Sequence, residues 1–238
     1  MDLRGNAVTW LGHGTWLWET SAGGRLLVDC WTRNNPACPE EYREPGGLGT
    51  IDGILITHGH FDHLTDAVEI IRATGAPAFA IFETAMYLGG RGLETVTGFN
   101  KGGTIEVAGC RATMVNAVHS GGITAEDGTI VEGGDPAGYV VEFPDGLVVY
   151  HAGDTDVFGD MALIAEIYRP DVAVLPIGDL YTMSPRQAAH AVRLLGVRQV
   201  LCGHWGTFPP LTGRPAQLRD LVGEGVEIPD LEPGQRFG

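Results

Sequence analysis

The sequence lacks the features that mark secreted and membrane proteins. Its four cysteines form no C-x-x-C pair and are too sparse for a disulfide scaffold. No apolar run approaches the roughly 20 residues that span a bilayer. The first six residues, MDLRGN, show no basic segment followed by an apolar one, so no signal peptide is visible. We therefore expect a cytoplasmic protein with no membrane partner.

Basic residues are also scarce. Fifteen lysines and arginines stand against 30 aspartates and glutamates, which gives a formal net charge of −15. A nucleic acid would be repelled by this field, and no local Lys/Arg cluster offsets it. The composition excludes nucleic acid as a partner and favours a small-molecule substrate. Part of the acidic excess would be balanced by bound cations.

The chain also lacks repeats and low-complexity linkers. Glycine is frequent, with 36 residues, and the glycines stand between apolar runs, as in a protein with many tight turns. An apolar fraction of 44% is enough to bury a core. We predict a single α/β domain over residues 1–238, and the sequence leaves open whether it forms a homo-oligomer.

Strands dominate the first part of the predicted structure, and helices alternate with strands in the second. The early strands are Ala7–Trp10, Thr15–Trp18, Arg25–Asp29 and Gly53–Thr57, and the later ones are Thr104–Val107, Arg111–Ala117, Tyr139–Phe143, Leu147–Tyr150, Val172–Pro176 and Gln199–Cys202. Helices are predicted over 66–74, 160–168 and 184–195. This order suits two packed sheets covered by helices on their outer faces. Asn34–Thr50 and Ser120–Gly138 fit neither element and are predicted as lids.

The motif with the clearest chemistry is Thr57-His58-Gly59-His60-Phe61-Asp62-His63. Three histidines and one aspartate occur within six residues at the end of a buried strand. Imidazole and carboxylate are ligands for zinc, manganese, iron and nickel. The spacing of His58 and His60 points both side chains the same way, and Asp62 and His63 begin the next turn. The loop can therefore offer two pairs of ligands to two adjacent ions.

Further ligands are expected at the ends of later strands. His119, Asp154 and His204 each follow a predicted strand closely. Open α/β sheets place their binding sites at such strand ends. Taken together, the three residues complete a candidate site with the His58–His63 loop.

The combined motif resembles the metallo-β-lactamase superfamily. Within it, the chain is similar to a branch of short metal-dependent hydrolases related to L-ascorbate-6-phosphate lactonase. The similar segments extend over nearly the whole chain and include LGHGT at 11–15, AVHS at 117–120, YHAGDT at 150–155, PIGD at 176–179, TMSP at 182–185 and HWGTFP at 204–209. Trp205 departs from the usual tyrosine, Cys202 from a frequent proline, and Gly121 from a frequent second serine. The resemblance implies a four-layer αββα sandwich with two mixed sheets.

The resemblance also implies a ligand set for two divalent ions, zinc first, with manganese, iron or nickel as alternatives. One ion would be held by His58, His60 and His119, and the other by Asp62, His63 and His204, with Asp154 bridging the two. Asp62 and Asp154 would orient the attacking water. Two cations lower the pKa of such a water and polarise the substrate oxygen.

Other residues have two readings each. Asp29 either orients a ligand histidine or only forms a turn, and His13 either donates to the substrate or only shapes its glycine turn. Asp179 and Met183 are predicted to border the pocket. His151 is read as a buried histidine with satisfied hydrogen bonds, His190 as an ordinary helical residue, and Cys202 as an inert buried thiol.

The predicted function is hydrolysis of a small-molecule ester, lactone or phosphoester. Thioester hydrolysis of the glyoxalase II type is disfavoured by the lack of a helical C-terminal extension, and lactam cleavage stays open. A diiron redox protein is disfavoured by His60, where such relatives carry glutamate. A non-catalytic metal-binding or ligand-sensing protein is the remaining alternative.

Overall fold

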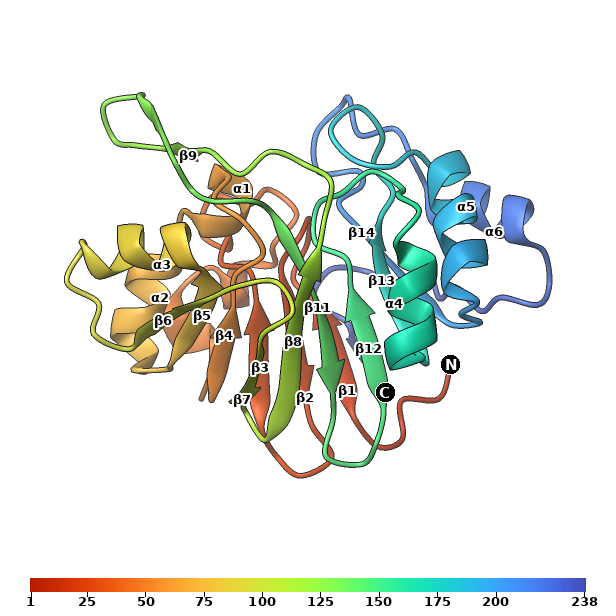
Figure 1. Cartoon of the computed structure of the whole chain (residues 1–238), viewed down its shortest axis with the longest axis horizontal. Coiled ribbons are helices and arrows are strands. Elements are labelled where there is room, and N and C mark those ends of the chain that lie inside the picture. Colours follow the sequence, from red (N-terminus) through yellow and green to blue (C-terminus); the bar gives the residue numbers. More distant parts are fainter.

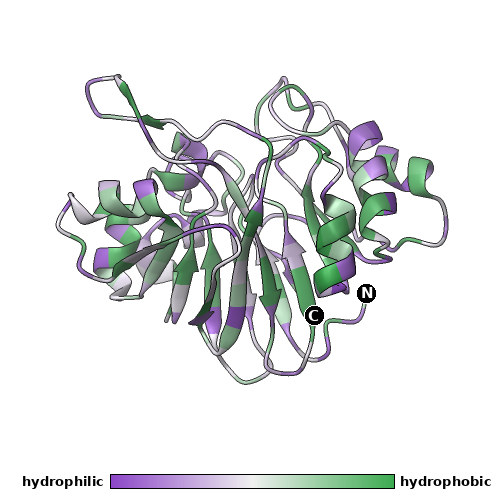
Figure 2. Ribbon diagram, viewed as in Figure 1, coloured by the Kyte–Doolittle hydropathy of each residue, from purple (hydrophilic) through white to green (hydrophobic).

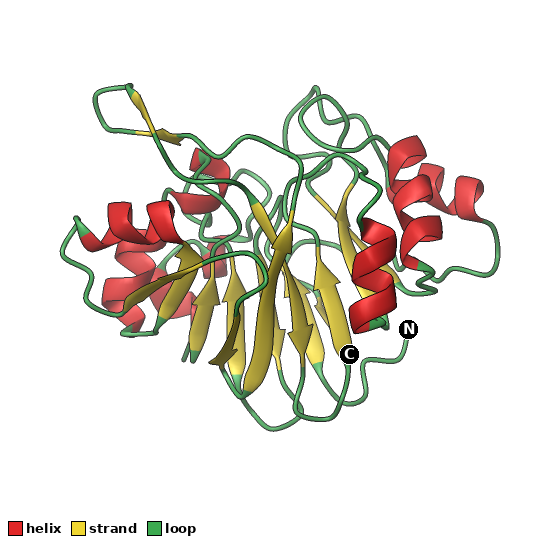
Figure 3. Cartoon of the chain, in the orientation of Figure 1, coloured by secondary structure: helices red, strands yellow, loops and turns green.

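The computed structural model describes residues 1–238 and consists of two mixed β-sheets that pack face to face, with helices outside them (Figure 3). The first sheet has seven strands. Their spatial order is β15 (Arg236–Phe237), β1 (Ala7–Trp10), β2 (Trp16–Glu19), β3 (Arg25–Val28), β4 (Gly53–Leu55), β5 (Ala78–Ile81) and β6 (Val96–Phe99). The strands from β15 to β3 pair antiparallel, and those from β3 to β6 pair parallel.

The second sheet has six strands and the same mixed character. Their order is β14 (Val200–Gly203), β13 (Val172–Pro176), β12 (Val148–His151), β11 (Ala137–Glu142), β8 (Cys110–Asn116) and β7 (Thr104–Val107). The strands from β14 to β12 pair parallel, and those from β12 to β7 pair antiparallel. A separate two-stranded hairpin, β9 (Ile123–Thr124) with β10 (Ile130–Val131), projects beyond the sheets (Figure 1).

The helices lie on the two outer faces. α2 (Ala67–Thr74) and α3 (Phe82–Gly89) lie on the side of the first sheet, and α4 (Met161–Tyr168), α5 (Pro185–Leu195) and α6 (Pro215–Val222) lie on the side of the second (Figure 1). α5 begins with the predicted capping box of Ser184 and Gln187, with Pro185 at its first position. No helix combines the length and the apolar character needed to cross a bilayer.

Three hydrophobic cores correspond to the three contacts between four layers. The middle core joins the sheets through residues such as Trp18 of β2 and Tyr139 of β11. A second core packs the first sheet against α2 and α3, and a third packs the other sheet against α4, α5 and α6. Apolar residues accordingly fill the sheet interior and the inner helix faces (Figure 2). The αββα sandwich implied by the resemblance is confirmed.

The predicted strands and helices are present, with ends that coincide or shift by one or two residues. Five further elements, β5, α3, β6, α6 and β15, were not predicted from the sequence. The two segments expected to be irregular contain short elements. Asn34–Thr50 includes the 3-10 turns η1 (Glu40–Tyr42) and η2 (Pro45–Leu48), and Ser120–Gly138 includes the β9–β10 hairpin.

Candidate metal centre

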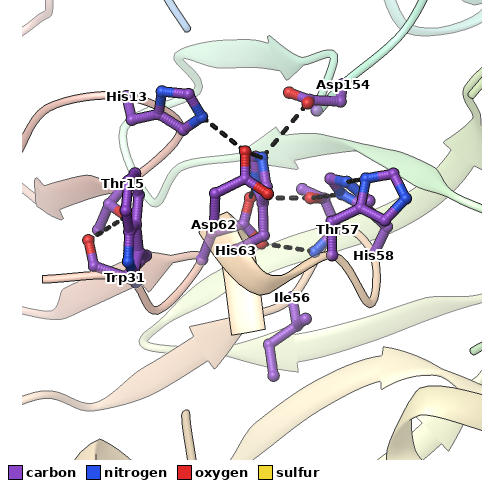
Figure 4. A network of polar contacts seen from close by, with 12 residues as sticks. His13, Thr15, Trp31, Ile56, Thr57, His58, Asp62, His63 and Asp154 are labelled. Atoms are coloured by element: carbon purple, nitrogen blue, oxygen red, sulfur yellow. Dashed lines mark hydrogen bonds and ion pairs between the residues drawn. The ribbon is translucent and has the colours of Figure 1, made fainter. Parts of the chain in front are cut away.

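The chemically distinctive side chains meet where strands of both sheets end. His13 follows β1, Asp29 follows β3, and the His58–His63 loop follows β4. From the second sheet, His119 follows β8, Asp154 follows β12 and His204 follows β14. The carboxyl ends of these strands lie at the same end of the sandwich, so residues far apart in sequence converge there (Figure 4).

A single helical turn directs the side chains of the His58–His63 loop. α1 (Phe61–Leu64) begins directly after His60, whose carbonyl accepts from the backbone N–H groups of His63 and Leu64 at 3.0 Å each. The change from extended chain to helix separates His58 and His60 from Asp62 and His63. This loop therefore supplies residues to two groups of donors.

The first group consists of His58, His60 and His119. His60 Nδ1 lies 3.0 Å from His58 Nε2 and 3.3 Å from His119 Nε2. Two donors bound at about 2.1 Å to one tetrahedral ion would lie roughly 3.4 Å apart. The Ser120 hydroxyl lies 3.1 Å from His60 Nε2, the ring nitrogen that faces away from the group. These distances suit one shared cation.

The second group consists of His13, Asp62, His63 and His204. Asp62 Oδ2 lies 2.7 Å from His13 Nε2, 3.5 Å from His204 Nε2 and 3.8 Å from His63 Nε2. His13 points at Asp62 in Figure 4. Its φ of +55° also places it in a left-handed turn. Neither of the two roles considered for His13 from the sequence included this contact with Asp62.

Asp154 lies between the two groups. Its Oδ2 is 2.9 Å from His204 Nε2, 3.3 Å from His63 Nε2 and 3.8 Å from His119 Nε2. The carboxylate therefore faces members of both groups and suits the bridging position expected for it.

Asp29 fixes the orientation of one histidine in each group. Its Oδ2 accepts from His63 Nδ1 at 2.7 Å and from the Thr57 hydroxyl at 2.8 Å. That hydroxyl lies 2.9 Å from His58 Nδ1, so it links His58 to the same carboxylate. A partner on the outer nitrogen leaves the other nitrogen free for a metal. The contact with His63 fits the first of the two alternatives for Asp29, and the role of Thr57 was not predicted.

The first group is electrically neutral. Burial lowers the pKa of His58 well below its ordinary range, and burial also lowers the pKa of His60 and His119. Neutral imidazoles hold free lone pairs, which is the state that binds a metal.

The second group holds opposite charges close together. Although burial opposes charge on His204, Asp154 outweighs it and raises the pKa of His204 to about 9. Burial is likewise outweighed at His63, whose pKa Asp154, Asp29 and Asp62 raise. Burial disfavours ionised Asp62 and Asp154, yet the neighbouring histidines hold both of their pKa values low. Buried, ionised Asp62 and Asp154 are stable only beside a positive charge, either on these histidines or on a bound cation.

Buried ring nitrogens without hydrogen-bond partners also indicate a cation site. His63 Nε2, His204 Nε2 and His13 Nδ1 are buried and make no directed hydrogen bond. Buried polar atoms almost always have partners, so such a cluster of exceptions needs an explanation. A cation among imidazole and carboxylate donors would satisfy the nitrogens of His63 and His204 and balance the aspartates.

A cavity of about 490 Å³ opens above this cluster. The cluster contributes His13, His60, Asp62, His119, Asp154 and His204 to its lining, and the other lining residues are Phe61, Ser120, Tyr181, Phe208 and Pro210. Of the two predicted lids, 34–50 contributes nothing and 120–138 contributes only Ser120. Phe61 and Phe208 stand inside the conspicuous motifs, and this adjacency was the signal that could have identified them.

Two residues predicted to border the pocket do not line it. Met183 is fully buried in the core beneath α5, and Asp179 is exposed. They form the turn that presents Tyr181, since the Asp179 N–H donates to the Met183 carbonyl at 3.0 Å. Asp179 and Met183 do not line the cavity because the chain turns sharply after β13, and Tyr181, which lies between them in sequence, faces the cavity instead.

The remaining histidines and Cys202 lie outside the donor groups. His190 is exposed on α5. His151 is buried, with the Gly153 N–H 3.4 Å from its Nδ1, but its Nε2 has no partner, so the expectation of satisfied hydrogen bonds is wrong for that atom. Burial raises the pKa of Cys202 to about 12, which agrees with an inert thiol.

Comparison with known proteins now gives the class. Residues 24–205 match the model of the β-lactamase superfamily domain, so the chain belongs to that superfamily.

The chain is more particularly a metal-dependent hydrolase like those of the UPF0173 group. It is 49% identical to the UPF0173 metal-dependent hydrolase of Rubrobacter xylanophilus, over 99% of this chain and 98% of the relative. It is 46% identical to that of Koribacter versatilis, over the full length of both. The solved structure of Igni18, a metallo hydrolase from Ignicoccus hospitalis, is 33% identical, with a TM-score of 0.83 over 98% of this chain and 97% of that one.

Proposed function

We propose that this metal-dependent hydrolase uses two divalent ions to cleave a small-molecule ester, lactone or phosphoester. Zinc is the first ion to test, followed by manganese, iron and nickel. The observation that carries the proposal is the position of Asp154, whose Oδ2 faces histidines of both donor groups at the base of the cavity.

Seven residues of the chain would hold the ions. His58, His60 and His119 would bind one, Asp62, His63 and His204 the other, and Asp154 both. When bound, the ions would lower the pKa of a water molecule and polarise the carbonyl or phosphoryl oxygen of the substrate.

The side chains around these donors would orient the reactants. Asp62 and Asp154 both line the cavity, so their carboxylates are available to orient the attacking water. His13 restrains Asp62 through the 2.7 Å contact, and Asp29 restrains His63 through another. The buried positions of these four residues keep bulk water from competing for the same hydrogen bonds.

Small-molecule substrates suit the electrostatics better than nucleic acid. The net charge is −15, and neither lysine nor arginine lines the cavity. A polyanion would therefore meet no compensating positive charge beyond the metal ions. A cytoplasmic location and a homo-oligomeric state stay predictions.

The test is metal content of the purified protein by elemental analysis, in the wild type, His60→Ala and Asp154→Ala. We expect about two ions per chain in the wild type, fewer in both variants, and the wild-type value in His190→Ala, whose side chain is exposed on α5. Full occupancy in the first two variants would refute the ligand assignment. A metal-replete wild type that turns over no ester, lactone or phosphoester would refute the substrate proposal.

A further inference from the structure

The walls of the cavity differ in chemistry from its base. The base holds the donor groups, whereas Phe61, Tyr181, Phe208 and Pro210 form the walls. Ser120 is the remaining lining residue, and it adds one hydroxyl group. No lysine or arginine lines the cavity, although recognition of a phosphate or carboxylate normally relies on such side chains.

The arginine that follows Phe208 and Pro210 in the chain, Arg214, is engaged elsewhere. Arg214 Nη1 donates to the carbonyls of Leu211 and Gly213 at 2.8 and 2.7 Å. Its guanidinium also lies over the Trp205 ring, 5.6 Å from the centroid. An anionic acyl group lying against these walls would therefore meet no lysine or arginine.

One aromatic wall is anchored to the interior. The rings of Phe61 and Phe208 each lie 5.8 Å from the Trp31 ring, and Trp31 is only 3% exposed. Trp31 in turn packs edge-on against His13, with ring centroids 5.1 Å apart. Phe61 is nevertheless 53% exposed although it precedes Asp62 directly. The wall is thus packed on a buried ring, continuous with the donor groups and open to a ligand.

The part of the wall formed by Tyr181 depends on a strained turn. Asp179 and Leu180 have φ values of +71° and +58°, a left-handed conformation that non-glycine residues rarely adopt. The turn is held by the Asp179 side chain, which accepts from the Leu180 N–H at 2.8 Å, and by the buried Met183 carbonyl. Strain of this kind accumulates at functional sites. Here it presents Tyr181, which is 58% exposed, to the cavity.

We infer that the site accepts an uncharged carboxylic ester or lactone with an apolar acyl group, and that Phe61, Phe208 and Tyr181 select that group. The inference rests on the proposed hydrolysis and narrows it by excluding phosphoesters and anionic esters. Water adds to the acyl carbon, the bond from that carbon to the alkoxy oxygen breaks, and the alkoxy oxygen takes a proton from the water. An open-chain ester gives a carboxylic acid and an alcohol, and a lactone gives a single hydroxycarboxylic acid.

The test compares four substrates that all release phenol: phenyl hexanoate, phenyl acetate, phenyl hydrogen adipate and diphenyl phosphate. With the metal-replete wild type, we expect kcat/KM for the hexanoate to exceed each of the other values by roughly tenfold or more, because apolar walls discriminate by about that factor or above. A preference for the adipate or the phosphate would overturn the inference and leave the hydrolase function intact.

Variants of the wall connect the preference to named residues. Phe208→Ala and Tyr181→Ala should lower kcat/KM for the hexanoate roughly tenfold, mainly through KM, and lower that for the acetate less. Tyr181→Arg should raise activity on the adipate and reduce it on the hexanoate. Phe82→Ala is the matched control, since Phe82 is 51% exposed on α3 and outside the cavity lining. Equal effects on all substrates would refute selection by the wall.

A binding measurement separates the wall from the chemistry. 1-Phenylheptan-2-one has the shape of phenyl hexanoate but no bond to hydrolyse, and its binding to the metal-free protein can be followed by calorimetry. We expect binding that Phe208→Ala and Tyr181→Ala weaken at least severalfold and Phe82→Ala leaves unaltered. Undiminished binding in the wall variants would overturn the inference. Absent turnover of every ester, lactone and phosphoester would instead overturn the proposed function.

Discussion

The two donor groups differ in charge although they share a bridging residue. His58, His60 and His119 form a neutral group whose pKa values burial lowers. His63 and His204 lie among carboxylates that raise their pKa values against the effect of burial. Asp154 touches both groups but is closer to the second.

This difference teaches that one fold can prepare two neighbouring cation sites in different ways. The neutral group offers lone pairs at once, whereas the second group holds protons in the place of a cation. A metal must displace those protons, so its affinity there depends more steeply on pH. We expect the first ion to bind at His58, His60 and His119.

The largest effect should come from Gly14→Ala, which acts on the second group alone. A Cβ at Gly14 would collide with the His63 ring, whose other side is held by Asp29. We expect the affinity for the second ion to fall by more than the roughly 100-fold typical of losing an outer partner, with the first ion retained. Isothermal titration with zinc measures both affinities.

Gly159→Ala is the matched control for this substitution, because no atom lies near a Cβ at Gly159 and its φ is not left-handed. Equal loss of both ions in Gly14→Ala would mean that the two groups cannot be separated.

The pH dependence of the metal-free protein should be the next largest effect. The pKa of His204 is about 9 in the fold because Asp154 outweighs burial, against an ordinary value of 6.5. Protonated His204 therefore stabilises the fold fully below pH 6.5, and this contribution, on the order of 3 kcal/mol, is lost as pH rises through 9. Metal binding needs the neutral ring, so the metal should stabilise more at high pH.

Melting temperatures with and without zinc at pH 6.5 and pH 9 measure this effect. We expect Tm of the metal-free protein to fall between these values and the gain on adding zinc to grow. The first group has the opposite sign, because its lowered pKa values cost stability as pH falls below 6.5. A gain from zinc that shrinks toward pH 9 would contradict the charge difference between the groups.

His13→Gln should weaken only the second group. His13 Nε2 lies 2.7 Å from Asp62 Oδ2, and glutamine does not reproduce a ring nitrogen at that place. We expect affinity for the second ion to fall about 10- to 100-fold, as for other partners of metal ligands. Cobalt substitution, with one absorption spectrum recorded per added equivalent, distinguishes the ions. His190→Gln, exposed on α5, should behave as the wild type.

Thr57→Val should weaken only the first group, and by the smallest amount. Valine keeps the shape of threonine but removes the hydroxyl that lies between Asp29 and His58. Asp29 would still accept from the Thr57 N–H at 2.8 Å and from His63. We expect about a tenfold loss of affinity for the first ion, near the low end for such partners. Loss of the second ion instead of the first in the same cobalt titration would contradict the proposed link from Asp29 through Thr57 to His58.

Much of the site was predictable because its residues occupy recognisable positions in sequence. His58, His60, Asp62 and His63 share one motif, and His119, Asp154 and His204 each follow a strand. All seven meet in the structure, and their role as ligands stays a prediction until metal content is measured. Thr57 and His13 were harder to assign, because their roles depend on partners 28 and 49 residues away.

The elements that were not predicted have weak local patterns. β5 and α3 form one apolar run, Ala78–Gly89, in which no period separates strand from helix. β15 has only two residues and exists through its pairing with β1. The prediction that 34–50 forms a lid was wrong, since none of its residues lines the cavity. Polar composition indicates a loop but not which surface the loop covers.

The sequence by itself determined the sandwich of two sheets, the capping of α5 and seven of the eight histidines and aspartates that meet in the donor groups. Strand periodicity, capping residues and clustered histidines are local properties that can be read along the chain. Only the tertiary structure decided how the donors divide into a neutral group and a charged one, and what covers them. Burial and charge depend on neighbours from both sheets, and the cavity walls of Phe61, Tyr181 and Phe208 come from three separate segments.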